Sequence, residues 1–264
     1  MSVATQQIVL QYDDEQKLLL KNLINIRFRR ALAIGLNLNI SVISNTGIPN
    51  TTLINDIIDA DMGKNIQTIQ LNRLTSLCSQ RATNWVNETI SVMSALRQRN
   101  KASSPILKKY SLTPSPINIL SGGFPGIQQL KSVIDLKIYI EAPFYIRLLG
   151  MILEYKAGSA EIIKKILQFK KYSPLMDIER SSADIIVQLP YFIGPQKLSS
   201  NVIPPEKGTL IVSWQPESEM DIKLMKHDDL YCLFYYWYGQ PICHLPLELK
   251  SMKKICEIDF KAIY

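Results

Sequence analysis

Apolar and polar side chains repeat with two different periods along the chain, and each period predicts its own kind of element. Residues 36–42, "LNLNISV", alternate strictly between apolar and polar side chains. This period of two predicts a strand with one face in solvent. Further along, apolar residues recur at intervals of three and four, which predicts a helix with one apolar stripe: Ala82, Trp85, Val86, Thr89, Ile90, Met93 and Leu96.

Helix-start and helix-stop signals indicate where further helices lie. Asp13 can cap a first helix, with Gln16 in the capping-box position and acidic residues in the first turn. That helix runs through "EQKLLLKNLINIRFRRAL", and its arginines suit a helix C-terminus. Helical patterning returns at "TTLINDIIDADM" and continues after Gly63 to about Asn100. Two more helices are predicted at "FYIRLLGMILEYK" and "SAEIIKKILQFKKY".

Strand signals dominate the C-terminal part of the chain. "DLKIYIE" predicts one strand, and five more segments follow from residue 183 onward: "ADIIVQLPYF", "GTLIVSW", "DIKLM", "LYCLFYYWY" and "PICHLPLEL". Both alternate faces of "LYCLFYYWY" are apolar, which predicts a central strand. Gly239-Gln240 offers a two-residue turn, and Pro241 and Pro246 in the next segment predict an edge strand because proline has no N–H.

Composition shifts at residues 100–126, which contain four prolines and three glycines. Such a stretch is typical of a linker or a long surface loop. We therefore expect an α+β protein with a mainly helical N-terminal half and a mixed C-terminal half that ends in an antiparallel β-sheet. The expected division is a helical domain at 1–100, a linker at 101–126 and an α+β domain at 127–264.

The overall composition is that of a chain that folds around a core. Of its 264 residues, 47% are hydrophobic and 20% are charged. The N-terminus lacks signal-peptide features, and the longest apolar runs fall short of the roughly 18 residues that span a bilayer. Four cysteines are too few for a disulfide scaffold of this size. We expect an intracellular, cytoplasmic protein with reduced thiols, with the nucleus or a virion as alternatives.

The net charge of +7 comes from the middle of the chain, because residues 61–140 hold ten basic and three acidic residues. A cluster of this kind can neutralise phosphates or anionic headgroups. The alternative is a solvated helix face whose cations also suit the helix C-terminus. The predicted polyanion-binding residues are Arg73, Arg81, Arg97, Arg99, Lys101, Lys108 and Lys109.

The aromatic run near residue 235 has three interpretations. A buried hairpin is favoured over a base-stacking platform, because the flanking acids at 217–229 would repel phosphates. Aromatic rings and tyrosine hydroxyls also suit a protein–protein contact. The residues predicted for self-association are Tyr231, Phe234, Tyr235, Tyr236, Trp237 and Tyr238.

Signatures of catalysis are weak. The chain has two histidines, no G-x-S-x-G elbow, no P-loop and no G-x-G-x-x-G fingerprint. Its cysteines and histidines lack the paired spacing of zinc sites. Asp229 followed by Glu248-Leu-Lys250 has the form of a two-metal nuclease set, but the acid-x-Lys pattern recurs three times elsewhere. We therefore predict no catalytic residue, no metal ligand and no cofactor.

Together these patterns favour a non-enzymatic assembly or scaffold protein, such as a viral matrix-like or capsid-associated protein. It would form a homo-oligomer and contact RNA, nucleoprotein or an anionic membrane surface through its basic segment. The first alternative is a single-stranded nucleic-acid-binding or transport protein, and the second is a metal-dependent nuclease.

Overall fold

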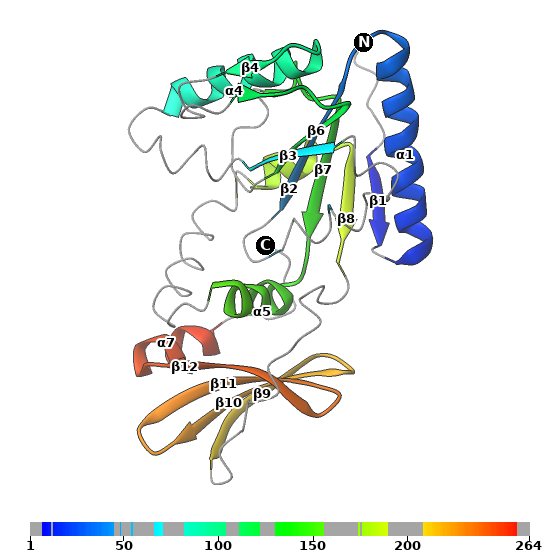
Figure 1. Cartoon of the computed structure of the whole chain (residues 1–264). Helices are drawn as coiled ribbons and strands as arrows, with labels where there is room; N and C mark the ends of the chain where they lie inside the picture. The colour runs from blue at the N-terminus through cyan, green and yellow to red at the C-terminus, as the bar shows by residue number, and fades with distance from the viewer. Residues whose placement is uncertain are drawn as a thin grey trace. The chain divides into compact units, whose positions relative to one another are not determined.

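The computed structural model of the chain describes residues 7–11, 13–44, 48, 54, 66–70, 82–103, 111–121, 130–155, 174, 176–189 and 208–257. The chain divides into two compact units. Unit 1 consists of Met1–Asn45, Asn50–Glu141 and Pro174–Leu189. Unit 2 consists of Thr46–Pro49, Ala142–Ser173 and Pro190–Tyr264. Figure 1 shows the helices and strands of both units.

Unit 1 is built on a six-stranded sheet in which every pairing is parallel. The strand order is β1-β8-β7-β2-β6-β3. Such sheets belong to α/β folds, in which crossover segments connect the strands and cover the sheet. The strands are β1 (Ile8–Gln11), β2 (Leu38–Ser44), β3 (Ile66–Gln70), β6 (Ile117–Ser121), β7 (Leu136–Glu141) and β8 (Ile185–Gln188).

Unit 1 has two long helices, α1 (Asp14–Ala33) and α4 (Ala82–Arg97), and the local sequence explains the ends of α1. Asp13 caps α1, and its Oδ1 accepts a 2.8 Å hydrogen bond from the Gln16 backbone N–H. Past the end of α1, Gly35 adopts a positive φ of 76°, which glycine tolerates without strain. A short antiparallel pair, β4 (Ala102–Ser103) and β5 (Ser111–Leu112), follows α4.

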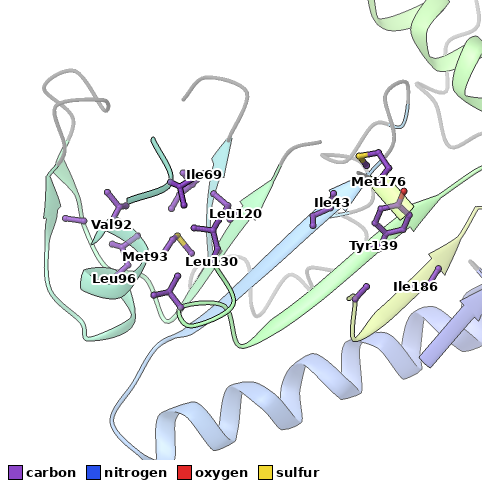
Figure 2. Packing of buried hydrophobic residues seen from close by; sticks show 14 residues of the cluster. Ile43, Ile69, Val92, Met93, Leu96, Leu120, Leu130, Tyr139, Met176 and Ile186 are labelled. Carbon is purple, nitrogen blue, oxygen red and sulfur yellow. The ribbon is translucent and has the colours of Figure 1, made fainter. Parts of the chain in front are cut away.

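One face of the parallel sheet packs against α4. Met93 and Leu96 of this helix are fully buried, and Figure 2 shows them beside Leu120 and Leu130. Tyr139 of β7 and Met176 lie in another part of the same hydrophobic cluster. The cluster thus joins α4 to the strands at the centre of the sheet. Its other buried members are Ile43, Ile69, Val86, Val92, Ala102, Val133, Ala183 and Ile186.

Asn39 of β2 lies at the centre of a buried hydrogen-bond network on this face. Its amide nitrogen donates to the carbonyl oxygens of Met93 at 2.8 Å and Val133 at 2.9 Å. Its amide oxygen accepts a 2.9 Å hydrogen bond from Asn118 of β6. Its backbone N–H donates to the Asp135 carboxylate at 3.0 Å. One fully buried side chain therefore ties β2 to α4, to β6 and to the segment that leads into β7.

Unit 2 contains a four-stranded antiparallel sheet in the order β12-β11-β10-β9. The helices α5 and α7 both contact β12. Alternate residues of the central strands form a buried face, with Ile222, Leu224, Leu233 and Tyr235 all fully buried. The elements are α5 (Phe144–Tyr155), β9 (Thr209–Glu217), β10 (Met220–His227), β11 (Leu230–Trp237), β12 (Gln240–Leu247) and α7 (Leu249–Cys256).

The expected fold class, α+β with a mainly helical N-terminal half, was wrong. The N-terminal half supplies four of the six strands of a parallel sheet, and the fold is α/β with an added antiparallel sheet. Strand β3 lies inside the stretch predicted as helical, and β6 lies inside the stretch 101–126 predicted as a linker. The division into two units also differs from the expected domain boundaries.

Residues 38–42 of the predicted segment 36–42 do form a strand, which extends to Ser44, but the predicted solvent-exposed face does not exist. Every residue of β2 is buried, including Asn39 and Ser41. The alternation arose because polar side chains occupy core positions. Asn39 is stabilised in its buried position by hydrogen bonds. A buried polar residue whose hydrogen bonds are all formed can thus produce the same sequence pattern as a residue that faces solvent.

Several local predictions were confirmed. Helices were found at α1, α4 and α5, and strands at β7 to β12. The aromatic strand β11 lies inside its sheet, and β12 with its two prolines lies at an edge. The turn between them is Tyr238-Gly239, one residue earlier than expected, and both residues have positive φ. The predicted helices at 51–62 and 159–172 lie outside the described residues, except for Ile54.

None of the helices in the described part of the chain combines the length and the apolar character needed to cross a bilayer.

Replacing Asn39 by alanine should destabilise the protein strongly. The change leaves two buried carbonyl oxygens and the Asn118 amide without their partner, and each unsatisfied group costs about 1–3 kcal/mol. Urea unfolding should show a loss of at least about 3 kcal/mol. Asn87→Ala, at an exposed position of α4, is the control and should change stability by less than about 0.5 kcal/mol. Equal effects of the two substitutions would contradict the role of Asn39.

Candidate functional site

The strand order of unit 1 singles out one position at the carboxyl ends of the parallel strands. From β2 the chain passes to β3 on one side, and from β7 it passes to β8 on the other side. Strands β2 and β7 are neighbours, so the chain turns in opposite directions from adjacent strands. In open α/β sheets, ligands bind beyond the carboxyl ends of the strands at such a switch point. The carboxyl ends of β2, β6 and β7 therefore form the candidate site.

Small hydroxyl side chains end two of these strands. Ser44 is the last residue of β2, Ser121 is the last residue of β6, and both are buried. In the parallel register Val42 pairs with Ser121, so Ser44 lies two residues further along the same face. Ser44 itself pairs with Ile140 of β7. The two serines thus place hydroxyl groups, and little side-chain bulk, at the switch point.

On the opposite face, the carboxyl end of β7 carries a charged group that is already bound. The buried Glu141 accepts hydrogen bonds from Arg180 Nε at 2.6 Å, from Arg180 Nη2 at 3.2 Å and from Gln188 at 2.7 Å. The hydrogen bond that Arg180 donates to the Glu141 carboxylate raises the pKa of Arg180. This paired geometry holds residues 176–181, which are helical, against the sheet.

A second ion pair lies on the same face, nearer the amino end of β7. Lys137 Nζ donates to the Glu179 carboxylate and to the Ser182 hydroxyl. The side chains of Lys137 and Glu179 are 10% and 2% exposed, so both charges lie out of water. The two ion pairs fix the segment before β8 in position, which makes them structural rather than ligand-binding groups.

The sequence directly after β2 is informative, although residues 45–47 and 49–53 lie outside the described part of the chain. From Ser44 to Thr52 it reads "SNTGIPNTT". A phosphate-binding P-loop comes after a strand and has the pattern G-x-x-x-x-G-K-[ST]. Here Thr51 occupies the hydroxyl position, while Ser44, Pro49 and Asn50 replace the two glycines and the lysine. Only Thr51 matches the pattern, so this segment is not a P-loop.

The predicted polyanion-binding residues are only partly described. Arg97 is engaged, because its Nη2 lies 2.6 Å from Asp135 and its Nη1 donates to the Ser132 carbonyl at 3.3 Å. Arg99 and Lys101 are exposed, and Arg99, in the turn after α4, has a positive φ of 65°. Binding of RNA, nucleoprotein or an anionic membrane through this segment stays a prediction. Arg73, Arg81, Lys108 and Lys109 lie outside the described residues.

The aromatic residues predicted for self-association lie on β11 and in the turn after it. Phe234 and Tyr235 are buried, and the Tyr235 hydroxyl donates to the Tyr145 carbonyl at 3.4 Å. Burial raises the pKa of Tyr235. Tyr231, Tyr236 and Trp237 are half-buried, and Tyr238 is exposed. The hairpin is thus mainly a core element, and self-association through it stays a prediction.

No group of three or more histidine, cysteine or acidic side chains gathers in a metal-binding arrangement among the residues that the structure describes. Asp229 lies in the turn between β10 and β11, and Glu248 precedes α7 as its N-cap.

Comparisons with known proteins return structural likenesses only. No protein-family profile and no curated protein matches the chain. One similar solved structure, assigned as a fructose transport system kinase from Silicibacter sp. TM1040, is 14% identical and has a TM-score of 0.41. The match covers 63% of this chain and 98% of that one. Another is shikimate kinase from Bacteroides thetaiotaomicron, at 12% identity and a TM-score of 0.35, covering 56% and 84% of the two chains.

These findings correct the expected function. The chain was expected to be a non-enzymatic, viral matrix-like or capsid-associated scaffold, with a nucleic-acid-binding protein and a nuclease as alternatives. Both structural neighbours are kinases, neither is a viral or matrix protein, and the larger sheet is parallel α/β. The exclusion of an enzyme is not kept, because a parallel α/β sheet with a switch point is a fold that also serves enzymes. At these TM-scores the likeness carries no argument about a substrate or a reaction.

Sequence reasoning missed Ser44 and Ser121. Each follows an apolar run, but serine at a strand end is also an ordinary turn residue. The signal that could have identified them is positional, because both end strands that are buried on both faces. Recognising it required the knowledge that "INILS" is a strand rather than part of a linker.

Replacing one partner of a buried ion pair should lower the free energy of unfolding more than replacing both partners. Lys137→Met leaves Glu179 buried without its partner, and we expect a loss of about 3 kcal/mol or more in urea unfolding. The double variant Lys137→Met/Glu179→Leu should recover at least about 1 kcal/mol of that loss. Lys17→Met, which removes the ion pair with the fully exposed Asp14, is the control and should have little effect. A double variant less stable than the single one would contradict this role.

The thiols of unit 2 should differ in reactivity. Burial raises the pKa of Cys232 from 9.0 to about 11 and that of Cys243 to about 12, so both stay protonated at pH 8. Iodoacetamide should therefore modify the exposed Cys256 first, as read by peptide mass spectrometry. Since folding raises both pKa values, the stability they contribute is complete below 9.0 and is lost as the pH rises toward 12. Modification of native Cys243 as fast as Cys256 would contradict this prediction.

Proposed function

We propose that unit 1 binds a phosphorylated ligand of the nucleotide class at the carboxyl ends of β2, β6 and β7. The observation that carries the proposal is the strand order, which places the switch point between β2 and β7. Ser44 ends β2 at this point, and Ser121 ends β6, the strand on the other side of β2; both have small hydroxyl side chains. Serine hydroxyls can donate hydrogen bonds to phosphate oxygens.

The choice of a phosphorylated ligand rests on the sequence directly after β2. "SNTGIPNTT" follows β2 directly in the sequence and contains Gly47 and two threonines, which are residue types that phosphate-binding loops use. Backbone N–H groups and hydroxyls bind phosphate without needing a lysine. Asn50 stands where a P-loop has its lysine, so a phosphate bound here would lack that positively charged partner. We therefore expect weaker binding than in a P-loop that keeps the lysine. An intracellular location, where nucleotides are abundant, is part of the same proposal.

Ser44 and Ser121 should each be needed for binding. Calorimetric titration of the full chain with ATP should show saturable binding, and adenosine should not bind because it has no phosphate. Ser44→Val and Ser121→Val each remove a hydroxyl and add a branched side chain at the site. Each should weaken ATP binding about tenfold or more, which is about 1.4 kcal/mol.

Ser213→Val is the matched control, since Ser213 is exposed on β9 of unit 2. It should leave ATP affinity unchanged. Circular dichroism and the melting temperature of each variant show whether the fold is kept. The proposal fails if the wild-type chain binds neither ATP, GTP nor pyrophosphate at millimolar concentration. It also fails if folded Ser44→Val and Ser121→Val proteins bind ATP as tightly as the wild type.

A further inference from the structure

The solvent face of α1 carries several large apolar side chains. Only Leu20, Ile24 and Ala31 of its 20 residues are buried. On the other side, Leu18 is 59% exposed and Ile26 is 49% exposed. Leu19 lies beside them and is 45% exposed. Apolar side chains that gather on one exposed stripe, rather than singly, mark an interaction site.

Charged and polar residues complete this stripe in a definite order. At 100° per residue, Glu15, Leu18, Asn22, Ile26 and Arg29 fall within an arc of about 80°. All five are exposed. The stripe therefore runs from an acid, through an apolar centre interrupted by Asn22, to a base. We call these five residues the α1 stripe.

The α1 stripe is complementary to itself when reversed. Glu15 and Arg29 each lie seven residues from Asn22, and Leu18 and Ile26 each lie four residues from it. A second helix packed antiparallel, with its Asn22 opposite this one, would set Glu15 against Arg29 and Leu18 against Ile26 twice over. A contact in which the same patch serves both partners is the kind that a two-fold symmetric dimer needs.

We infer that the α1 stripe is a homodimer interface and that its partner is the α1 stripe of a second copy of this chain. The two apolar pairs supply the buried surface, and the two ion pairs set the antiparallel direction. Asn22 against Asn22 on the axis fixes the register, because a slipped alignment leaves a polar amide against leucine or isoleucine.

Two other occupants fit the α1 stripe less well. An anionic membrane would suit Arg29 and the leucines, but Glu15 on the same stripe would face the lipid phosphates and be repelled. The aromatic hairpin is the other region considered for self-association, yet Phe234 and Tyr235 are 3% and 0% exposed, and the exposed Leu230 and Tyr238 lie apart at the two ends of β11. The self-complementary pattern favours a second copy of α1.

A charge exchange tests this interface in the full-length chain. Sedimentation velocity over a range of concentrations should show a monomer–dimer equilibrium that weakens at high salt, because the ion pairs are exposed. Glu15→Arg alone places two positive charges opposite each other, and Arg29→Glu alone places two negative charges opposite each other. Each should raise the dimer dissociation constant at least about tenfold. The double variant Glu15→Arg/Arg29→Glu restores opposite charges and should return it to within about threefold of the wild type.

Lys131→Glu is the control, because it makes the same charge change as Arg29→Glu at an exposed position of unit 1 away from α1. It should leave the dimer intact. Ile26→Glu, which buries a charge in the apolar centre, should give a folded monomer by circular dichroism. A wild-type chain that stays monomeric, a double variant no tighter than the single ones, or loss of dimer in Lys131→Glu would each overturn the inference. So would co-flotation of the monomer with phosphatidylserine vesicles that depends on Arg29.

Discussion

The hydrogen bonds of Asn39 are the constraint on which the architecture of unit 1 depends. A fully buried amide is tolerable only where its donors and acceptor are satisfied, and here α4, β6 and the segment before β7 all supply partners. Asp135 extends the network, since its carboxylate accepts from the Asn39 backbone and pairs with Arg97 at the end of α4. These groups lie at the amino ends of β2 and β6. The amino ends of these strands are therefore held in place by internal hydrogen bonds and an ion pair, and the groups of this network bind one another.

The carboxyl edge is organised differently, and this asymmetry is what makes it the candidate site. Strands β2 and β6 end in small hydroxyl residues, while the charged group at the end of β7 is held by Arg180 and Gln188 on the opposite face. The buried ion pairs position the segment before β8, and the Asn39 network positions β2 between its neighbours. Rigid support at one edge and small polar side chains at the other are the arrangement expected of an α/β ligand site.

Local elements could be predicted from sequence where a single period and clear end signals coincide. The cap at Asp13 and the apolar stripe of α4 are examples, and so are the hairpin strands between acidic or glycine-containing turns. The sheet as a whole could not, because its central strands contain polar core residues. Asn39 and Ser41 made β2 resemble a half-exposed strand, and the prolines and glycines around β6 made it resemble part of a linker. Without β3 and β6, neither the parallel order nor the switch point could be inferred, and Ser44 and Ser121 looked like turn residues. The surplus of basic residues at 61–140 led to the prediction of a polyanion-binding segment. Arg97, one of the predicted residues, forms an ion pair with Asp135 inside unit 1.

The measurement that tests the central claim most directly is amide hydrogen exchange of the full chain with and without ATP. Ligand binding at the carboxyl edge should slow exchange in peptides that contain the ends of β2 and β6. Peptides from the amino ends of these strands and from residues 208–257 should exchange at unchanged rates. Protection confined to unit 2, or no difference at saturating ATP, would contradict a ligand site at the switch point of the parallel sheet.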